Sequence, residues 1–368
     1  MRMMSFSLHF WALCTILLNI ACHTCQEHVW LPGNHVALFI FGDSVFDAGN
    51  NNDINTTSQA NYFPYGESFF KNPTGRFSDG RIIPDFIAEY VKLPFIPPYL
   101  QPGNHDFSIG VNFASGGAGA LDETNKGKVI NLGTQLGYLK DVSQHLRKKL
   151  GDAEAKALLS RAVYLFNVGS NDYVVPFKIN SSVLRSYTHQ EFVGQVIGNI
   201  TEVTEDIYKI GGRKFAFGNI VPFACVPLLR TYEGQNGACL DQITPFIELH
   251  NKEFSKLLQK LQRELKGFKY SLLDVYTFLK ERMDHPSKYG FKESKVACCG
   301  SGPYRGIFSC GGKRGVTEYE LCDNVNDYVF FDSSHLTEKA YEQFSKQVWD
   351  GKLSFKGGYN LKSLFELN

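Results

Sequence analysis

Residues 37–51 read Ala-Leu-Phe-Ile-Phe-Gly-Asp-Ser-Val-Phe-Asp-Ala-Gly-Asn-Asn, and this stretch decides the fold prediction. Its apolar run ends abruptly at Gly42-Asp43-Ser44. A short apolar run bounded by turn residues predicts a buried strand. Ser44 then lies at the carboxyl end of that strand, where open α/β sheets bind their ligands. A serine at this position can expose its hydroxyl and leave its backbone N–H free to meet negative charge.

Further apolar runs predict strands at 111–114, 162–168, 214–220 and 270–275. Apolar residues at helical spacing predict helices over 190–210 and after Asp241. Strands that alternate with helices favour a central parallel sheet covered on both faces, which is a three-layer α/β/α domain. Because no repeat or low-complexity linker divides the chain, we predict a single domain over residues 26–368.

Composition excludes several classes of function. With 368 residues, 43% of them hydrophobic, the chain is long enough to build a full core. A net charge of +1 gives no reason to expect nucleic acid or an anionic membrane surface as a partner. No segment after the N-terminus reaches about 20 uninterrupted apolar residues, so stable membrane insertion is not expected. The sequence leaves the oligomeric state open.

The N-terminus has the pattern of a secretory signal peptide, approximately residues 1–25. Arg2 precedes an apolar stretch over 6–21. A membrane anchor is the alternative, but the stretch is short for a membrane span. We therefore expect a secreted, extracellular protein, and the sequons at Asn55, Asn180 and Asn199 are its candidate glycosylation sites.

Cysteine usage agrees with an oxidising compartment. Short loops favour pairing Cys225 with Cys239, and two adjacent cysteines with two later ones in an order that the sequence leaves open. A zinc cluster is the alternative, but this region has no Cys-x-x-Cys pair and no interleaved histidine, so no metal is expected. The six cysteines after the leader are Cys225, Cys239, Cys298, Cys299, Cys310 and Cys322.

Three more blocks follow the first in chain order. They are Gly-Val-Asn-Phe-Ala-Ser-Gly-Gly-Ala-Gly at 110–119, Gly-Ser-Asn-Asp at 169–172 and Asp-Ser-Ser-His at 332–335. Together the four blocks resemble the GDSL esterase/lipase family of the SGNH hydrolases, in its secreted plant form. The resemblance implies a flavodoxin-like fold and a serine hydrolase that cleaves carboxylic esters of small molecules or lipids, with no cofactor.

The blocks also name candidate catalytic residues. A serine hydroxyl needs a neighbouring base, for which His335 is the candidate, and Asp332 would hold its imidazole in the required tautomer. The three-residue spacing lets one short turn deliver both groups from a single segment, which follows the strand-like run at 328–331. The resemblance implies an oxyanion hole built from the N–H groups of Ser44 and Gly116 and the amide of Asn171. Sequence alone does not separate Gly116 from its neighbour Gly117.

Several nearby polar residues are predicted to have supporting roles. Arg76 and Arg81 are expected to be structural ties, with substrate binding as the alternative. Two other functions stay open: an acyltransferase that uses the same acyl-enzyme, and a secreted binding glycoprotein without turnover. The residues expected to support the site or form turns are Asp43, Asp47, Asn50 and Asp172.

Overall fold

Five parallel strands form the central sheet in the part of the chain that the structure describes. The structure is a computed structural model, and it describes residues 36–103, 106–178, 186–232, 237–351 and 358–367. The sheet order is β2-β1-β3-β4-β5, and every strand lies within or next to an apolar run that predicted it. The strands are β1 Leu38–Gly42, β2 Gly110–Asn112, β3 Val163–Asn167, β4 Lys214–Gly218 and β5 Lys269–Leu273.

Aromatic side chains stack across neighbouring strands on one face of this sheet. Phe41 stacks on Phe166 with ring centroids 4.7 Å apart, and Phe166 stacks on Phe217 at 5.1 Å. The strand register places these three residues in line. Cross-strand aromatic pairs of this kind stabilise a sheet and fix its register. A fixed register places the carboxyl ends of β1 and β3 side by side.

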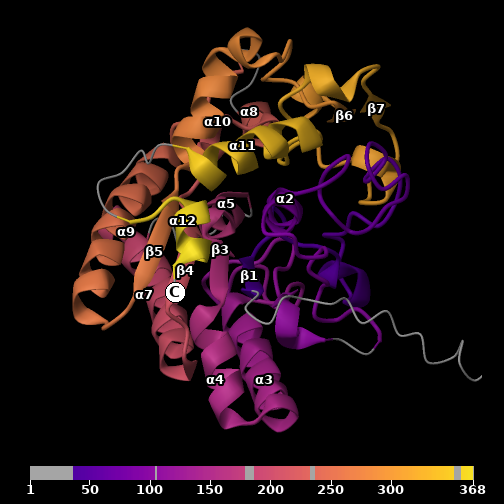
Figure 1. The fold of residues 1–368 in the computed structure, drawn as a ribbon. Coiled ribbons are helices and arrows are strands. Elements are labelled where there is room, and N and C mark those ends of the chain that lie inside the picture. Colours follow the sequence, from indigo (N-terminus) through magenta and orange to yellow (C-terminus); the bar gives the residue numbers. More distant parts are fainter. Residues whose placement is uncertain (1–35, 104–105, 179–185, 233–236, 352–357, 368) are drawn as a thin grey trace, which may run out of the picture. The chain divides into compact units, whose positions relative to one another are not determined.

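Helices cover both faces of the sheet, as Figure 1 shows. In one layer α3 (Leu132–Leu150), α7 (His189–Ile210) and α9 (Thr244–Glu264) pack side by side, with α4 (Asp152–Arg161) against α3. The other layer holds α2 (Ile83–Tyr90), α11 (Glu338–Asp350) and α12 (Leu361–Glu366). The chain steps from β1 to β2 in one direction along the sheet, and from β2 to β3, β4 and β5 in the other. Right-handed crossovers in opposite directions place their connections on opposite faces. The three-layer α/β/α prediction is confirmed.

Shorter helices lie in the connections. The α-helices are α5 Ser170–Lys178, α8 Pro227–Arg230 and α10 Val275–Asp284. The 3-10 helices are η1 Asn50–Asp53, η2 Phe107–Ile109, η3 Phe223–Cys225, η5 Pro286–Tyr289, η6 Pro303–Arg305, η7 Cys310–Gly312 and η8 Val325–Asp327.

Disulfide bonds organise the long connection between α10 and α11. Its only regular sheet within the described residues is an antiparallel pair, β6 (Cys299–Gly300) with β7 (Glu320–Leu321). The pairing of the adjacent cysteines, which the sequence left open, is Cys298 with Cys322 and Cys299 with Cys310. The third disulfide joins Cys225 and Cys239, as their spacing predicted.

The strand-like run at 328–331 does not join the central sheet. Its backbone instead pairs with the cysteine-rich connection, since Cys298 and Cys299 donate to the carbonyl oxygens of Phe330 and Phe331. Phe331 N–H in turn donates to His335 O, which closes the turn that follows. The run is apolar because it is buried under that connection, and this is why its composition resembles a strand.

The predicted signal peptide and the sequon at Asn180 lie outside the described residues. Within those residues, no helix combines the length and apolar character that a membrane span requires. Residues 36–368 cluster as one unit, and the division of the chain into a leader and one domain stays a prediction.

Candidate active site

Ser44 follows β1 at the carboxyl edge of the sheet. The turn there is tight, because a Cβ added to Gly42 would lie 2.4 Å from the carbonyl oxygen of Asn167. Buried Gln135 on α3 pins the same glycine, accepting from its N–H and donating to its carbonyl oxygen, both at 2.9 Å. These contacts fix where β1 ends, and so fix the position of the Ser44 side chain.

His335 connects Ser44 to Asp332. Its Nε2 lies 2.7 Å from Ser44 Oγ, and its Nδ1 lies 2.7 and 2.8 Å from the two carboxylate oxygens of Asp332. With the proton on Nδ1, the imidazole donates to Asp332 and accepts from the Ser44 hydroxyl. Phe77 packs against the imidazole with ring centroids 4.8 Å apart. The arrangement gives a serine hydroxyl a base that is held in the tautomer needed to take its proton.

Asp332 is fully buried and surrounded by donors. The backbone N–H groups of Ser334 and His335 each donate to its Oδ1 at 2.9 Å, and Tyr65 Oη donates to Oδ2 at 2.6 Å. Burial alone would raise the pKa of Asp332. The charge and hydrogen bond of His335, the charge of Arg314 and the Tyr65 hydroxyl outweigh it and hold that pKa well below the ordinary value. Asp332 is therefore ionised at neutral pH.

Asn171 and Ser44 present donors to the same pocket. Asn171 Nδ2 donates to the carbonyl oxygen of Ala118 at 3.0 Å, which orients the amide and leaves its second N–H available. None of the described residues accepts a hydrogen bond from the backbone N–H of Ser44. Both residues line the pocket in which His335 lies.

Gly116, a predicted oxyanion donor, has a hydrogen-bond partner inside the protein. Its backbone N–H donates to Asp47 Oδ2 at 2.9 Å, so it is already engaged inside the protein. The neighbouring Gly117 lines the pocket, and no described residue accepts from its N–H. Gly117 has a φ of 88°, a left-handed conformation that favours glycine. The sequence could not separate the two residues, because the local backbone direction decides which N–H faces the substrate.

Three buried carboxyl groups stand behind this edge. Asp47 also accepts from the N–H groups of Gly49 and Asn50, each at 2.7 Å, and so closes the turn after Ser44. Burial raises the pKa of Asp43 to about 7, against the Val45 N–H bond and the charge of His335. Burial likewise raises the pKa of Asp47 and that of Asp172 to about 6. All of them support backbone near the site, as predicted.

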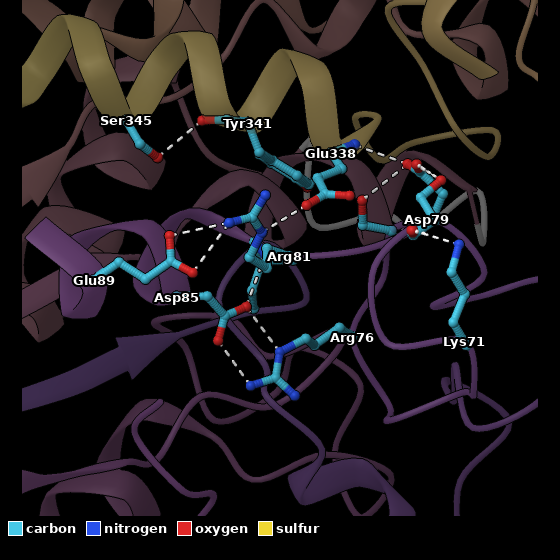
Figure 2. Close-up of polar contacts among 12 residues, drawn as sticks. Lys71, Arg76, Asp79, Arg81, Asp85, Glu89, Glu338, Tyr341 and Ser345 are labelled. Atoms are coloured by element: carbon cyan, nitrogen blue, oxygen red, sulfur yellow. Dashed lines mark hydrogen bonds and ion pairs between the residues drawn. The ribbon is translucent and has the colours of Figure 1, made fainter. Parts of the chain in front are cut away.

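Arg76 and Arg81 make structural ties (Figure 2). Arg76 forms a bidentate, buried ion pair with Asp85 on α2, with both nitrogen–oxygen distances at 2.8 Å. Arg81 bridges two helices, contacting Glu338 on α11 at 2.6 Å and Glu89 on α2 at 3.0 Å. Neither arginine lines the pocket. The bridge fastens α11, which follows directly after His335, to the segment after β1.

A pocket of about 300 Å³ opens in front of Ser44, and its lining combines polar and apolar side chains. Gly117 follows β2 and Val221 follows β4, so the pocket extends along the sheet edge on both sides of β1. The polar part of its lining includes Thr56, Thr57, Ser58, Asn125 and Lys128. The apolar part includes Val174, Val175, Val221, Phe223 and Val226, and Lys178 lines the pocket from the same helix as the first two.

Sequence comparison identifies the family. A family profile described as GDSL-like lipase/acylhydrolase matches residues 38–348. The chain belongs to this GDSL family. It is 55% identical over 360 residues to GDSL esterase/lipase 1 of Arabidopsis thaliana, covering 96% of each chain. It is 50% identical over 353 residues to a GDSL lipase of Tanacetum cinerariifolium, covering 95% of this chain and 93% of the relative.

Family membership confirms the predicted class of enzyme, a carboxylic ester hydrolase. GDSL esterase/lipase 3 of Arabidopsis thaliana is similarly close, at 54% identity over 96% of both chains. Among the described residues, no cluster of three or more His, Cys, Asp or Glu could hold a metal ion.

Proposed function

We propose that the protein hydrolyses esters through a Ser44–His335–Asp332 triad. The observation that carries the proposal is the unbroken chain of contacts from Ser44 Oγ through the imidazole to the buried carboxylate. His335 takes the Ser44 proton as the hydroxyl attacks the ester carbonyl, and then gives it to the leaving alcohol. Water activated by the same imidazole hydrolyses the acyl-enzyme.

The oxyanion of each tetrahedral intermediate needs donors that are fixed in advance. We assign this role to the backbone N–H groups of Ser44 and Gly117 and to the side-chain amide of Asn171. The pinned β1 turn, the left-handed glycine and the Ala118 carbonyl hold these donors before substrate binds. Gly116 instead supports the turn through Asp47.

The pocket supports an ester with one apolar and one polar arm as the substrate. Valine and phenylalanine side chains of the lining would shield an alkyl chain from water, at about 0.8 kcal/mol per buried CH₂. Threonine, serine, asparagine and lysine side chains of the lining would hydrogen-bond a polar group. Lipid esters and amphiphilic small-molecule esters both have this character.

Secretion is part of the proposal, and the disulfides support it, because such bonds persist in oxidising compartments. Asn55 is exposed and accessible to glycosylation, whereas Asn199 is half-buried on α7. Expression through a secretory pathway, followed by glycan removal, should give a mass change that Asn55→Gln reduces. An unglycosylated protein retained inside the cell would contradict this part of the proposal.

Covalent labelling tests the mechanism. A phosphonate ester should label Ser44, because the base that assists attack on an ester also assists attack on phosphorus. Ser44→Ala should abolish labelling and hydrolysis while the protein remains folded, and His335→Ala should nearly abolish both. Labelling at another serine would overturn the assignment. A folded wild-type protein that never labels would point to a binding glycoprotein. Formation of a new ester in place of the free acid when an alcohol is added would point to an acyltransferase.

A further inference from the structure

Two residues behind the triad continue its chain of contacts. We propose that Tyr65 and Arg314 are positioning residues that hold the Asp332 carboxylate and set how strongly it supports His335. The inference rests on the proposed triad, because it assigns a role to groups that reach the substrate only through Asp332. Neither residue belongs to any of the four sequence blocks, and both come from the long connections around the site.

Tyr65 is fully buried directly behind the carboxylate. Its Oη donates to Asp332 Oδ2 at 2.6 Å, and its ring packs edge-on against Phe331 and Phe77. Phe77 also covers the imidazole of His335. Tyr65 is therefore held by the same aromatic cluster that holds the base, and its hydroxyl has one fixed direction. Burial is the main cause that raises the pKa of Tyr65 well above its ordinary value, so the hydroxyl remains a donor.

Arg314 supplies a positive charge behind Tyr65. Its Nη1 donates to Tyr65 Oη at 2.8 Å, and its Nη2 donates to the carbonyl oxygen of Gln59. The guanidinium stacks over Phe308, with its carbon 3.8 Å from the ring centroid. Arg314 lies four positions after Cys310, which the disulfide to Cys299 ties to the segment beside Phe331. One covalent tie thus places the cation beside the triad.

The arrangement offsets part of the Asp332 charge. Asp332 Oδ2 receives the Tyr65 hydroxyl and Asp332 Oδ1 receives two backbone N–H groups, so both oxygens are fixed in direction. The charged and titratable groups that face Asp332 or His335 are Arg314, Tyr62, Tyr65, Tyr341 on α11 and, from the β1 side, Asp43. Removing Tyr65 Oη or Arg314 leaves the carboxylate less neutralised and freer to rotate. Its negative charge then stabilises the protonated imidazole more strongly.

The first test compares two tyrosines of the same cluster. Tyr65→Phe removes the hydroxyl on Asp332, whereas Tyr62→Phe removes a buried hydroxyl that has no hydrogen-bond partner among the described residues. We expect Tyr65→Phe to lower kcat about 10-fold, as expected for losing one hydrogen bond to a charged group, with KM unchanged. The acid limb of the pH–kcat/KM profile should move to higher pH. Tyr62→Phe should leave both readouts at wild-type values.

The second test removes the cation. Arg314→Met should lower kcat and move the acid limb of the pH–kcat/KM profile to higher pH. Arg314→Lys should move that limb part of the way back, because lysine returns the positive charge without the planar guanidinium. Lys313→Met is the matched control, since it removes an exposed cation from the adjacent position. Because both residues act through one carboxylate, Tyr65→Phe combined with Arg314→Met should cost less than the sum of the single changes.

Melting temperature and circular dichroism of each variant separate loss of fold from loss of rate. If Tyr65→Phe is folded and matches Tyr62→Phe in kcat and pH profile, the positioning role is wrong even though the triad stands. If hydrolysis survives in Ser44→Ala, the proposed function itself fails. If Tyr65→Phe does not fold, the Arg314 variants still test the inference. An acid limb of the pH–kcat/KM profile at the same pH in Arg314→Met as in Lys313→Met would overturn it.

Discussion

Asp43 is expected to make the folded protein less stable as the pH rises, and replacing it tests this directly. The side chain is 2% exposed, and burial is the main cause that raises its pKa to about 7 from an ordinary 3.8. Between these two pH values the folded protein keeps a proton that the unfolded chain has lost. The folded state therefore binds more protons, and its stability falls as the pH increases through this window.

The magnitude follows from the two pKa values. At 1.36 kcal/mol per pKa unit, about 4 kcal/mol of stability is lost between pH 4 and pH 8 through Asp43 alone. Asp43→Asn removes the titration but retains a side-chain oxygen to accept from Val45 N–H, a bond of 3.1 Å. The free energy of unfolding of the variant, relative to wild type, should therefore rise by about that amount from pH 4 to pH 8.

Urea denaturation followed by circular dichroism at intervals between pH 4 and pH 8 measures this difference. Asp332→Asn is the control, because the pKa of Asp332 is held well below its ordinary value. That carboxyl is ionised in both states above about pH 5, and its stabilising contribution is lost only as the pH falls below the ordinary value of 3.8. A difference for Asp43→Asn that stays flat, or that falls with pH, would refute the reasoning.

Three further perturbations probe other parts of the site. Asn171→Ala should lower kcat by roughly 10²–10³ with little change in KM, because one preorganised oxyanion donor is lost. Steady-state kinetics measures this, and a variant with wild-type kcat would exclude that role. Arg76→Met should cost about 3–5 kcal/mol by leaving the buried Asp85 carboxylate without its counter-charge. Calorimetry should show part of the loss recovered in Arg76→Met combined with Asp85→Asn, which removes the charge and keeps an oxygen to accept from Ile82 N–H. Replacing Cys225 and Cys239 by serine opens a loop with a sequence separation of 14 and should lower the free energy of unfolding by about 3 kcal/mol. Activity should be retained below the melting transition, and a folded but inactive variant would contradict a purely structural role.

The sequence predicted the parts of the molecule that depend on local patterns. The sheet was readable because strands buried on both faces are continuous apolar runs, and Ser44, Asp332 and His335 stand in short blocks at strand ends or turns. The choice between Gly116 and Gly117 needed the backbone direction in one turn. The run at 328–331 has the composition of a strand without joining the sheet, because burial under any layer gives the same composition.

Tyr65 and Arg314 had no signal that could be read in advance. Tyr65 is 267 positions from Asp332 and 249 from Arg314. No periodicity or spacing relates residues so far apart, and an isolated tyrosine or arginine in a long connection has many ordinary explanations. Their roles depend on how two loops fold over the same edge, and the order of the disulfides helps to decide that.

The proposed nucleophile and its base are separated by 291 positions. On the proposed mechanism, a polypeptide that is still leaving the ribosome carries Ser44 long before it carries His335. The newborn chain therefore has no means of attacking esters while it is being made. A premature stop between residues 44 and 335 would yield a protein that keeps Ser44 but lacks its base. On this mechanism, detectable hydrolysis reports that translation has passed residue 335.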